Sequence, residues 1–220
     1  MKRNEKKLII LGMMFMVVFV IWTIVIQMID VQPVPPKGMD VGFATFNTWF
    51  HGLTGVHMTI YYITDWLGLV PLFICMFFGG LGFIQLIKRR SLFKVDLDII
   101  LLGVYYSIVI GVYLIFEMIP INYRPILIEG FMEASYPSST TLLVLSVMPT
   151  LIFQAKQRLN SVVIQKAVCI LSVIFSLFMV IGRLLSGVHW FTDIVGSILF
   201  SMGLFCIYKS IVLLCHKDEN

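Results

Sequence analysis

Six long apolar runs separated by short polar stretches dominate the pattern of hydrophobic and polar positions along the chain. The runs cover residues 8–29, 66–87, 98–119, 138–153, 162–181 and 194–214. A helix needs about 20 apolar residues to cross a bilayer, and most of the runs are close to that length. The fourth run is shorter, and we expect its helix to extend into Gln154 and Ala155. The pattern predicts an all-α integral membrane protein, with six transmembrane helices in a single domain over residues 1–220.

The polar stretch between the first two runs, residues 31–65, is long enough to hold structure of its own. Its start is rich in proline, which breaks a helix. Phe43, Phe46, Phe50 and Leu53 then recur at spacings of three and four, which indicates a short helix with an aromatic face. That face either lies in the lipid interface or packs on the bundle. Either arrangement puts the helix where a lipid head group would enter.

Composition narrows the class of protein. Hydrophobic residues make up 59% of the chain, charged residues 13%, and the mean hydropathy is +0.96. These values exclude a soluble globule with a polar shell. The four cysteines fall inside the apolar runs or near the C-terminal end, without the spacing of a disulfide framework or a zinc site.

The distribution of positive charge predicts the orientation of the chain. All of the 16 Lys and Arg except Lys37, Arg124 and Arg183 lie at the chain ends or in connections on the same side as the ends. Basic residues gather on the cytoplasmic side of a membrane. We therefore expect a multi-pass protein of the cell membrane with both termini in the cytoplasm and residues 31–65 outside. The basic stretches then serve as orientation signals, and we expect no nucleic-acid partner.

Residues 182–193, GRLLSGVHWFTD, hold an arginine, a histidine and an aspartate that are costly in an apolar protein and usually functional there. His189 and Asp193 are four apart, so on a helix they share a face and the carboxylate can orient the imidazole. Arg183 offers the planar fork of donors that suits a phosphate. The alternative is structural: Thr192 or Asp193 caps the last helix, while Arg183 extends toward the membrane surface.

A second group of polar residues falls on the same predicted side of the membrane. Arg124 precedes Pro137-Ser138-Ser139-Thr140-Thr141, which has the form of a helix start whose free N–H groups can bind an anion. Two permanent cations, Arg124 and Arg183, repel each other unless an anion lies between them. Either a carboxylate of the chain supplies that charge or a bound phosphate does. The candidate carboxylates are Glu117, Glu129 and Glu133.

These motifs resemble those of the type 2 phosphatidic acid phosphatases, the PAP2 family. The family carries Lys and, after six residues, Arg-Pro; then Pro-Ser-Gly-His; then Ser-Arg, five residues, His, three residues and Asp. The third motif is present here as Gly182-Arg183, His189 and Asp193, while Arg124-Pro125 and Pro137-Ser138 remain of the other two. The order of the motifs and the six-span layout match as well, so the resemblance covers most of the chain and implies a PAP2-like bundle.

The resemblance implies a role for each matching residue. His189 would attack phosphorus and carry a phosphohistidine, and Asp193 would orient it. Phosphoryl oxygens would be held in a largely positional catalysis by Arg124, Arg183 and Ser138, with Ser139 and Thr140 of the same turn as further candidates. Neither a metal nor a cofactor is implied.

Three positions depart from the family motifs. Glu117 stands in place of the lysine, Ser139 in place of the glycine, and Thr140 in place of the histidine that protonates the leaving group. Loss of general acid catalysis typically costs about 10² to 10⁴ in rate. A diphosphate, which releases a phosphate, needs that proton less than a monoester does. A substitute acid would come from one of several other side chains, namely Glu129, Glu133, Tyr136, His51 or His57, with Tyr136 and Glu117 as accessory site residues.

The expected function is a membrane lipid phosphatase acting at the extracytoplasmic face on a phospholipid or polyprenyl phosphate, with a preference for lipid diphosphates. One alternative is a phosphotransferase that passes the phosphoryl group to an acceptor other than water. The other is a non-catalytic relative that binds phosphorylated lipid. A complete set of Arg183, His189 and Asp193 favours catalysis, because binding alone needs no oriented nucleophile.

Overall fold

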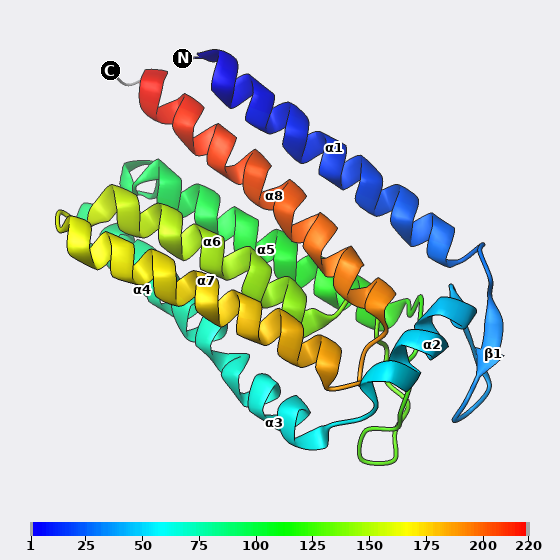
Figure 1. Cartoon of the computed structure of the whole chain (residues 1–220). Helices are drawn as coiled ribbons and strands as arrows, with labels where there is room; N and C mark the ends of the chain where they lie inside the picture. Colours follow the sequence, from blue (N-terminus) through cyan, green and yellow to red (C-terminus); the bar gives the residue numbers. More distant parts are fainter. Residues whose placement is uncertain (1, 219–220) are drawn as a thin grey trace.

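The computed structural model describes residues 2–218, which are largely helical (Figure 1). The helices are α1 (Lys2–Ile26), α2 (Ala44–Thr54), α3 (Met58–Leu67), α4 (Leu69–Arg89), α5 (Leu97–Met118), α6 (Ser139–Arg158), α7 (Val162–Leu185) and α8 (Phe191–Asp218), with a 3-10 turn at Leu92–Lys94. Two short antiparallel strands, β1 (Gln32–Val34) and β2 (Met39–Val41), form a hairpin between α1 and α2. Six helical segments are long and apolar enough to cross a membrane, with α3 and α4 counted as one. The prediction of an all-α membrane protein with six spans is confirmed.

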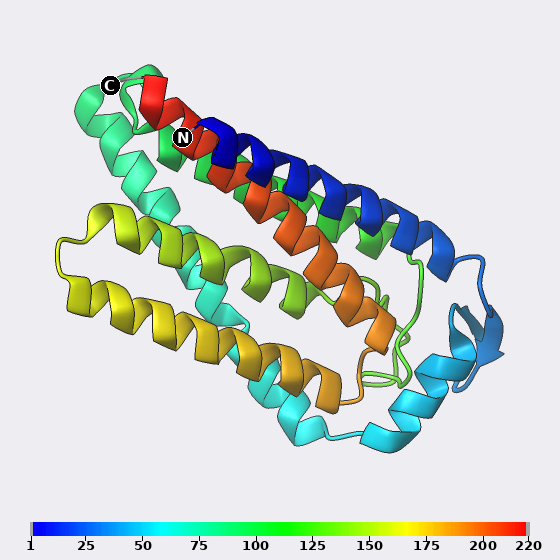
Figure 2. The same cartoon turned by 45° about the horizontal axis from the view of Figure 1, so that its top comes forward.

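Helix α6 occupies the middle of the bundle, with α7, α8, α4 and α5 packed around it (Figure 2). In its most apolar window 56% of the residues are buried, more than in any other span. A central helix faces protein instead of lipid, so it tolerates Ser, Thr and Gln when they are hydrogen-bonded. Tyr106 bonds Thr150 at 2.7 Å, and Gln154 donates to Tyr208 at 2.9 Å. These polar positions explain why the apolar run of this helix is short, and the predicted extension beyond residue 153 is confirmed.

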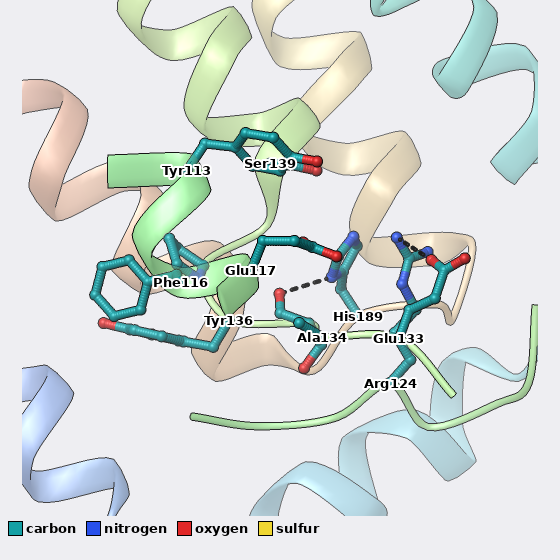
Figure 3. A pocket seen from close by; sticks show the side chains of 11 residues that line it. Tyr113, Phe116, Glu117, Arg124, Glu133, Ala134, Tyr136, Ser139 and His189 are labelled. Atoms are coloured by element: carbon teal, nitrogen blue, oxygen red, sulfur yellow. Dashed lines mark hydrogen bonds and ion pairs between the residues drawn. The ribbon is translucent and has the colours of Figure 1, made fainter. Parts of the chain in front are cut away.

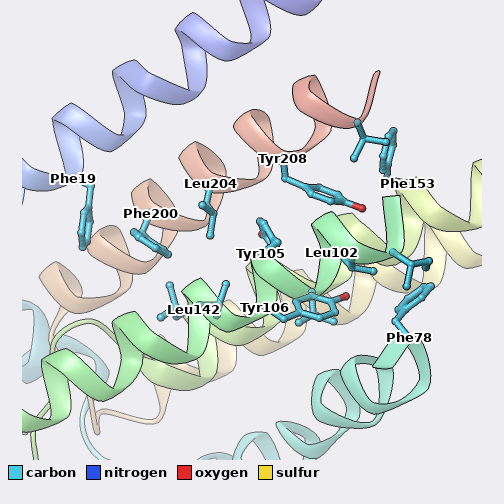
Figure 4. Packing of buried hydrophobic residues seen from close by; sticks show 14 of the residues in the cluster. Phe19, Phe78, Leu102, Tyr105, Tyr106, Leu142, Phe153, Phe200, Leu204 and Tyr208 are labelled. Carbon is cyan, nitrogen blue, oxygen red and sulfur yellow. The ribbon is translucent and has the colours of Figure 1, made fainter. Parts of the chain in front are cut away.

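Aromatic side chains from several helices fill the space around α6 (Figure 4). Phe19 of α1 packs edge-on against Phe200 of α8, with ring centroids 5.2 Å apart. Tyr105 of α5 meets Tyr208 of α8 at 5.1 Å. Rings of this size supply most of the contact area between helices that have few polar groups to share.

Helices α1 and α8 lie side by side along their length (Figures 1 and 2). A Cβ on Gly12 would lie 2.8 Å from the carbonyl oxygen of Gly203, so only glycine permits this approach. Small residues commonly allow such contacts between helices in membranes. The N-terminal end of α1 and the C-terminal end of α8 therefore lie at the same end of the bundle.

The second span begins earlier than the apolar run predicts. Helix α3 starts at Met58, eight residues before the run at 66–87, and α4 follows after Gly68. The sequence predicts residues 31–65 to lie outside the membrane, whereas the structure places residues 58–65 in α3. Thr64 is fully buried, and the side chains of Thr64 and Asp65 both contact Arg183 of α7. Thr64 therefore belongs to a polar interior, while Asp65, 54% exposed, meets Arg183 at the surface of the bundle, and both lie on a helix rather than in a loop.

Helix α2 confirms the expected helix in residues 31–65 and combines the two environments foreseen for it. Phe46 packs edge-on against Phe191 at the start of α8, with centroids 5.4 Å apart. The buried amide of Asn47 donates to Thr192 Oγ1 at 3.0 Å. Trp49 and Leu53 are 58% and 66% exposed. One face of α2 is therefore fixed to the bundle, and its other face carries apolar side chains outward.

Candidate active site

Two connections meet at the end of the bundle away from the N-terminal end of α1 (Figure 1). Residues 119–138 link α5 to α6 and fold back on themselves through the bridges Tyr123–Ala134 and Ile128–Phe131. Residues 186–190 link α7 to α8. The side-chain nitrogen of Trp190 donates to the carbonyl of Tyr123 at 2.7 Å and joins the two connections.

His189 is held with one ring nitrogen bonded and the other free. Nδ1 lies 3.1 Å from the carbonyl oxygen of Ser135 and 3.6 Å from Asp193 Oδ2. A carbonyl can only accept, so Nδ1 carries the proton and donates it. Nε2 is then the unprotonated nitrogen, and it is buried without a hydrogen-bond partner among the described residues. The imidazole therefore presents a lone pair from a fixed orientation, as a nucleophile requires.

Asp193 makes contacts that fit both of the roles considered from the sequence. It lies in the first turn of α8 and accepts the backbone N–H of Trp190 at 2.8 Å, as the acidic residue of a capping box does. The same oxygen faces the imidazole of His189. The backbone around it is tied to α6, because Ser197 Oγ donates to the carbonyls of Asp193 and Ser138 at 3.0 Å each.

The surroundings of His189 keep the imidazole neutral. Burial lowers its pKa well below the ordinary 6.5, and the positive charges of Arg124 and Arg183 lower the pKa further. The hydrogen bond to the carbonyl of Ser135 acts in the opposite direction and is the smaller effect. A neutral imidazole is the form that can attack phosphorus.

The two arginines keep donors free. Arg124 pairs with Glu133 at 3.1 Å through Nη2, while its Nε and Nη1 have no partner among the described residues. Arg183 is 1% exposed and makes long contacts of 3.3 Å to Thr64 and 3.4 Å to Asp65, with its Nε unpartnered in the same part of the chain. Both guanidinium carbons lie over the ring of Tyr61, at 5.8 and 4.9 Å from its centroid.

Unsatisfied donors on two buried cations are costly. The arrangement is suited to an anion with several acceptor oxygens.

A pocket of about 210 Å³ opens beside His189 and Arg124, whereas Arg183 is not among its lining residues (Figure 3). Its lining combines aromatic, hydroxyl and charged side chains, namely Tyr113, Phe116, Glu117, Arg124, Glu133, Ala134, Ser135, Tyr136, Pro137, Ser139 and His189. The volume is large enough for a phosphoryl group, but a lipid tail would have to lie outside.

The predicted phosphate-binding turn at the start of α6 is only partly turned toward the pocket. Ser139 lines it, whereas Ser138 and Thr140 do not. Ser138 is fully buried, and its hydroxyl donates to Thr141 Oγ1 at 3.1 Å. Thr140 is also buried, with its methyl group toward Gly68 at the junction of α3 and α4. Ser139 is thus the hydroxyl of this turn that a ligand would meet.

Tyr136 lines the pocket with its ring rather than with its hydroxyl. The hydroxyl is 2.8 Å from Thr23 Oγ1 of α1, and the ring stacks on Phe19. Burial raises the pKa of Tyr136. Tyr136 therefore forms part of the pocket wall and does not act as an acid, because its hydroxyl bonds Thr23 and holds its proton firmly.

The other predicted substitutes for the missing acid lie in different places. Neither histidine lines the pocket: His51 contacts the carbonyl of Gly187 at 3.1 Å, and His57 contacts that of Thr54 at 2.9 Å. Glu129 is exposed at a turn with φ of 50°. Glu133 does line the pocket, as does Glu117 from the last turn of α5.

Residues 186–190, the connection that carries His189, are supported by the ends of α2 and α3. The sequence did not predict this support. Gly187 has φ of 68°, and a Cβ there would lie 2.0 Å from the carbonyl oxygen of Gly55, so only glycine fits. The backbone N–H of His57 donates to Ser186 at 3.0 Å. The contacts of Asn47 with Thr192 hold the other side of the loop. Asn47 is one of several polar residues of α2, so nothing in the sequence singled out this contact.

Comparison with known proteins identifies the family of the chain. The sequence profile described as the PAP2 superfamily matches residues 75–216, which include both connections. The chain belongs to the PAP2 superfamily. A PAP2-type phosphatidylglycerolphosphate phosphatase from Bacillus subtilis has a similar crystal structure, with a TM-score of 0.56 and 17% sequence identity over 95% of this chain and 97% of that one. The comparison with curated proteins gives no match.

Membership in the superfamily confirms the predicted resemblance, and the solved structure shows that the same fold is shared along nearly the whole length of this PAP2 protein. At this level of identity the structural likeness speaks for the fold alone. The assignment of individual residues therefore depends on the geometry described above.

Proposed function

We propose that this PAP2 protein is a membrane lipid phosphatase that hydrolyses a lipid phosphate or, preferentially, a lipid diphosphate such as a polyprenyl diphosphate. The observation that carries the proposal is the free Nε2 of His189, which lines a pocket of phosphoryl size together with Arg124, whose Nε and Nη1 are unpartnered among the described residues. The buried charge of Arg183 acts on the same imidazole from outside the pocket lining. A binding protein needs the cations. It does not need a neutral imidazole whose second nitrogen is fixed by a carbonyl and a carboxylate.

In the proposed reaction His189 Nε2 attacks phosphorus and forms a phosphohistidine, which water then hydrolyses. The imidazole gains positive charge during the attack, and Asp193 at 3.6 Å stabilises it. The free N–H groups of Arg124, with the hydroxyl of Ser139, hold the equatorial oxygens, where charge accumulates in the transition state, and the charge of Arg183 adds to this stabilisation from outside the pocket lining. Thr140 would contribute through the backbone of the same turn, whereas the backbone N–H of Ser138 already donates to the carbonyl of Asp193 at 3.4 Å.

The proposal extends to orientation. The site lies at the end of the bundle opposite the N-terminal end of α1. Basic residues are concentrated at the end with the termini, as the positive-inside rule requires of a cytoplasmic face. We place the active site on the extracytoplasmic face of the cell membrane, with the apolar side chains of α2 in the outer lipid interface. Residues 1–220 then form a single membrane domain whose partners are the bilayer and its lipid substrate.

The preference for diphosphates follows from the residue that replaces the family's acid. The hydroxyl of Thr140 is too weak an acid to protonate a leaving group at neutral pH, and Thr140 does not line the pocket. A departing phosphate is a better leaving group than a departing alkoxide, so it suffers less from a weak acid. The preference for diphosphates is thus supported only by the leaving-group chemistry that follows from threonine at residue 140.

The test is phosphate release by the purified protein from matched lipid phosphates and diphosphates, including a polyprenyl pair. We expect release from both, faster from diphosphates, with loss of activity in His189→Ala and full activity in His57→Ala, whose exposed ring lies outside the pocket. Monoester rates equal to or above diphosphate rates would contradict the preference. Transfer of phosphate to a second lipid instead of water would favour the phosphotransferase alternative, and unchanged release by His189→Ala would overturn the proposal.

A further inference from the structure

Two carboxyl groups line the pocket beside His189, and the structure separates their roles. Glu133 is paired with Arg124 at 3.1 Å. This contact places the carboxylate of Glu133 against part of the positive charge of the arginine. For Glu117, no hydrogen bond or ion pair is recorded with any residue in the part of the chain that the structure describes.

The position of Glu117 fits proton transfer. It is the penultimate residue of α5, and its side chain extends across the pocket toward the imidazole of His189 (Figure 3). The groups that face it there are Tyr113 on the same helix, together with Arg124, Glu133 and His189 from the connections. Nucleophile, cation and carboxyl therefore surround one small volume. A carboxylic acid can lie beside a phosphate in that volume without the repulsion that a carboxylate would meet.

We propose that Glu117 is the general acid and base of the reaction, in place of the histidine that the chain lacks at residue 140. The inference rests on the proposed phosphatase function and names a catalytic residue for it. As His189 Nε2 bonds to phosphorus, the bond from phosphorus to the leaving oxygen breaks. The carboxylic acid of Glu117 gives its proton to that oxygen, which yields a lipid alcohol from a monoester or a lipid phosphate from a diphosphate.

In the second half of the reaction the carboxylate of Glu117 takes a proton from the attacking water. The water oxygen bonds to phosphorus, the bond between nitrogen and phosphorus breaks, and inorganic phosphate leaves. His189 is again neutral and Glu117 is again protonated, so both groups are restored. Of the other candidates, Glu133 is paired with Arg124 at 3.1 Å and the hydroxyl of Tyr136 bonds Thr23. Glu129, His51 and His57 do not line the pocket.

Leaving-group dependence tests the inference. Decyl phosphate and decyl diphosphate carry the same tail but differ in how much they need a proton. We expect Glu117→Gln to lower kcat/KM for decyl phosphate by about 10²-fold, and that for decyl diphosphate by no more than about twofold. Glu129→Gln, an exposed glutamate outside the pocket, is the matched control and should leave both rates unchanged. Thermal unfolding of each variant confirms that the fold is intact.

The outcomes distinguish this inference from the function on which it rests. Equal losses on the two substrates, or none, would overturn the role of Glu117 while leaving the phosphatase proposal in place. A wild-type protein that releases phosphate from the diphosphate only would also overturn it, because no acid would then be at work. Release from neither substrate by the wild-type protein would overturn the phosphatase proposal itself.

Discussion

Replacement of Asp193 by asparagine isolates the electrostatic part of the proposed catalysis. The amide has nearly the same shape, and its oxygen can still accept the N–H of Trp190 that the carboxylate accepts at 2.8 Å. The negative charge is lost 3.6 Å from His189 Nδ1. Opposite unit charges at that separation attract by about 5 kcal/mol at an effective dielectric constant near 20. The attraction exists only once the imidazole becomes cationic, so it lowers the barrier rather than the energy of the resting state.

This energy corresponds to a loss of roughly 10³- to 10⁴-fold in kcat for Asp193→Asn. The assay is steady-state phosphate release from a lipid diphosphate, with KM measured alongside. We expect KM to change little, because the carboxylate does not line the pocket. The thermal unfolding midpoint should stay within a few degrees, because a buried charge is removed and no cavity is created.

Asp98→Asn serves as the matched control. Asp98 is a buried aspartate in the first turn of α5, at the end of that helix away from Glu117 and the pocket. It pairs with Arg158 at 2.6 Å. Its substitution should reduce stability and leave the specific activity of the folded protein intact. A loss of less than about tenfold in kcat for a folded Asp193→Asn protein would refute the electrostatic argument.

Three further predictions follow from the support and charge of the connection between α7 and α8. Gly187→Ala should abolish most activity and lower the unfolding temperature, since its Cβ would lie 2.0 Å from the carbonyl oxygen of Gly55. Gly130→Ala is the control, because Gly130 has a similar positive φ but open space around it, so this variant should cost only backbone strain. Equal effects of the two variants in a melting assay would contradict this prediction. Asn47→Ala should reduce kcat by about tenfold or more and destabilise the protein by about 1–3 kcal/mol, because buried polar groups of Thr192 lose their hydrogen-bond partner. An unchanged kcat would contradict the inference that α2 positions the connection between α7 and α8. Since burial and the charges of Arg124 and Arg183 lower the pKa of His189, the imidazole should stay neutral as the pH falls through 6.5. The measurement is an NMR titration of isotope-labelled histidine. A midpoint for His189 at or above 6.5 would contradict the predicted effect of burial and of the two arginines.

The sequence predicted the bundle well because lipid imposes a simple rule. Spans that face lipid are apolar over their whole length, and these were found with their approximate limits. The signal weakened where a helix faces protein: α6 carries Thr150 and Gln154 inside the bundle, and α3 carries Thr64 against Arg183. The hairpin of β1 and β2 had no signal, because its strands are only three residues long.

The site was predictable where one motif holds both position and chemistry. His189 and Asp193 approach to 3.6 Å as expected, although only Asp193 lies on α8 and His189 lies in the connection before it. The roles of the glutamates could not be predicted in the same way. Which carboxyl pairs with Arg124 and which remains free depends on how residues 119–138 fold back, and neither periodicity nor spacing determines that path.

The covalent intermediate is the most direct test of the account. Wild-type protein mixed with a lipid diphosphate, quenched within the first turnovers under alkaline conditions and digested for mass spectrometry, should carry phosphate on His189. The signal should accumulate further in Glu117→Gln, where hydrolysis of the intermediate lacks its base, and should be absent from His189→Ala. Phosphate release that proceeds with no phosphorylated His189 at any time, or with the phosphate on another residue, would contradict the central claim.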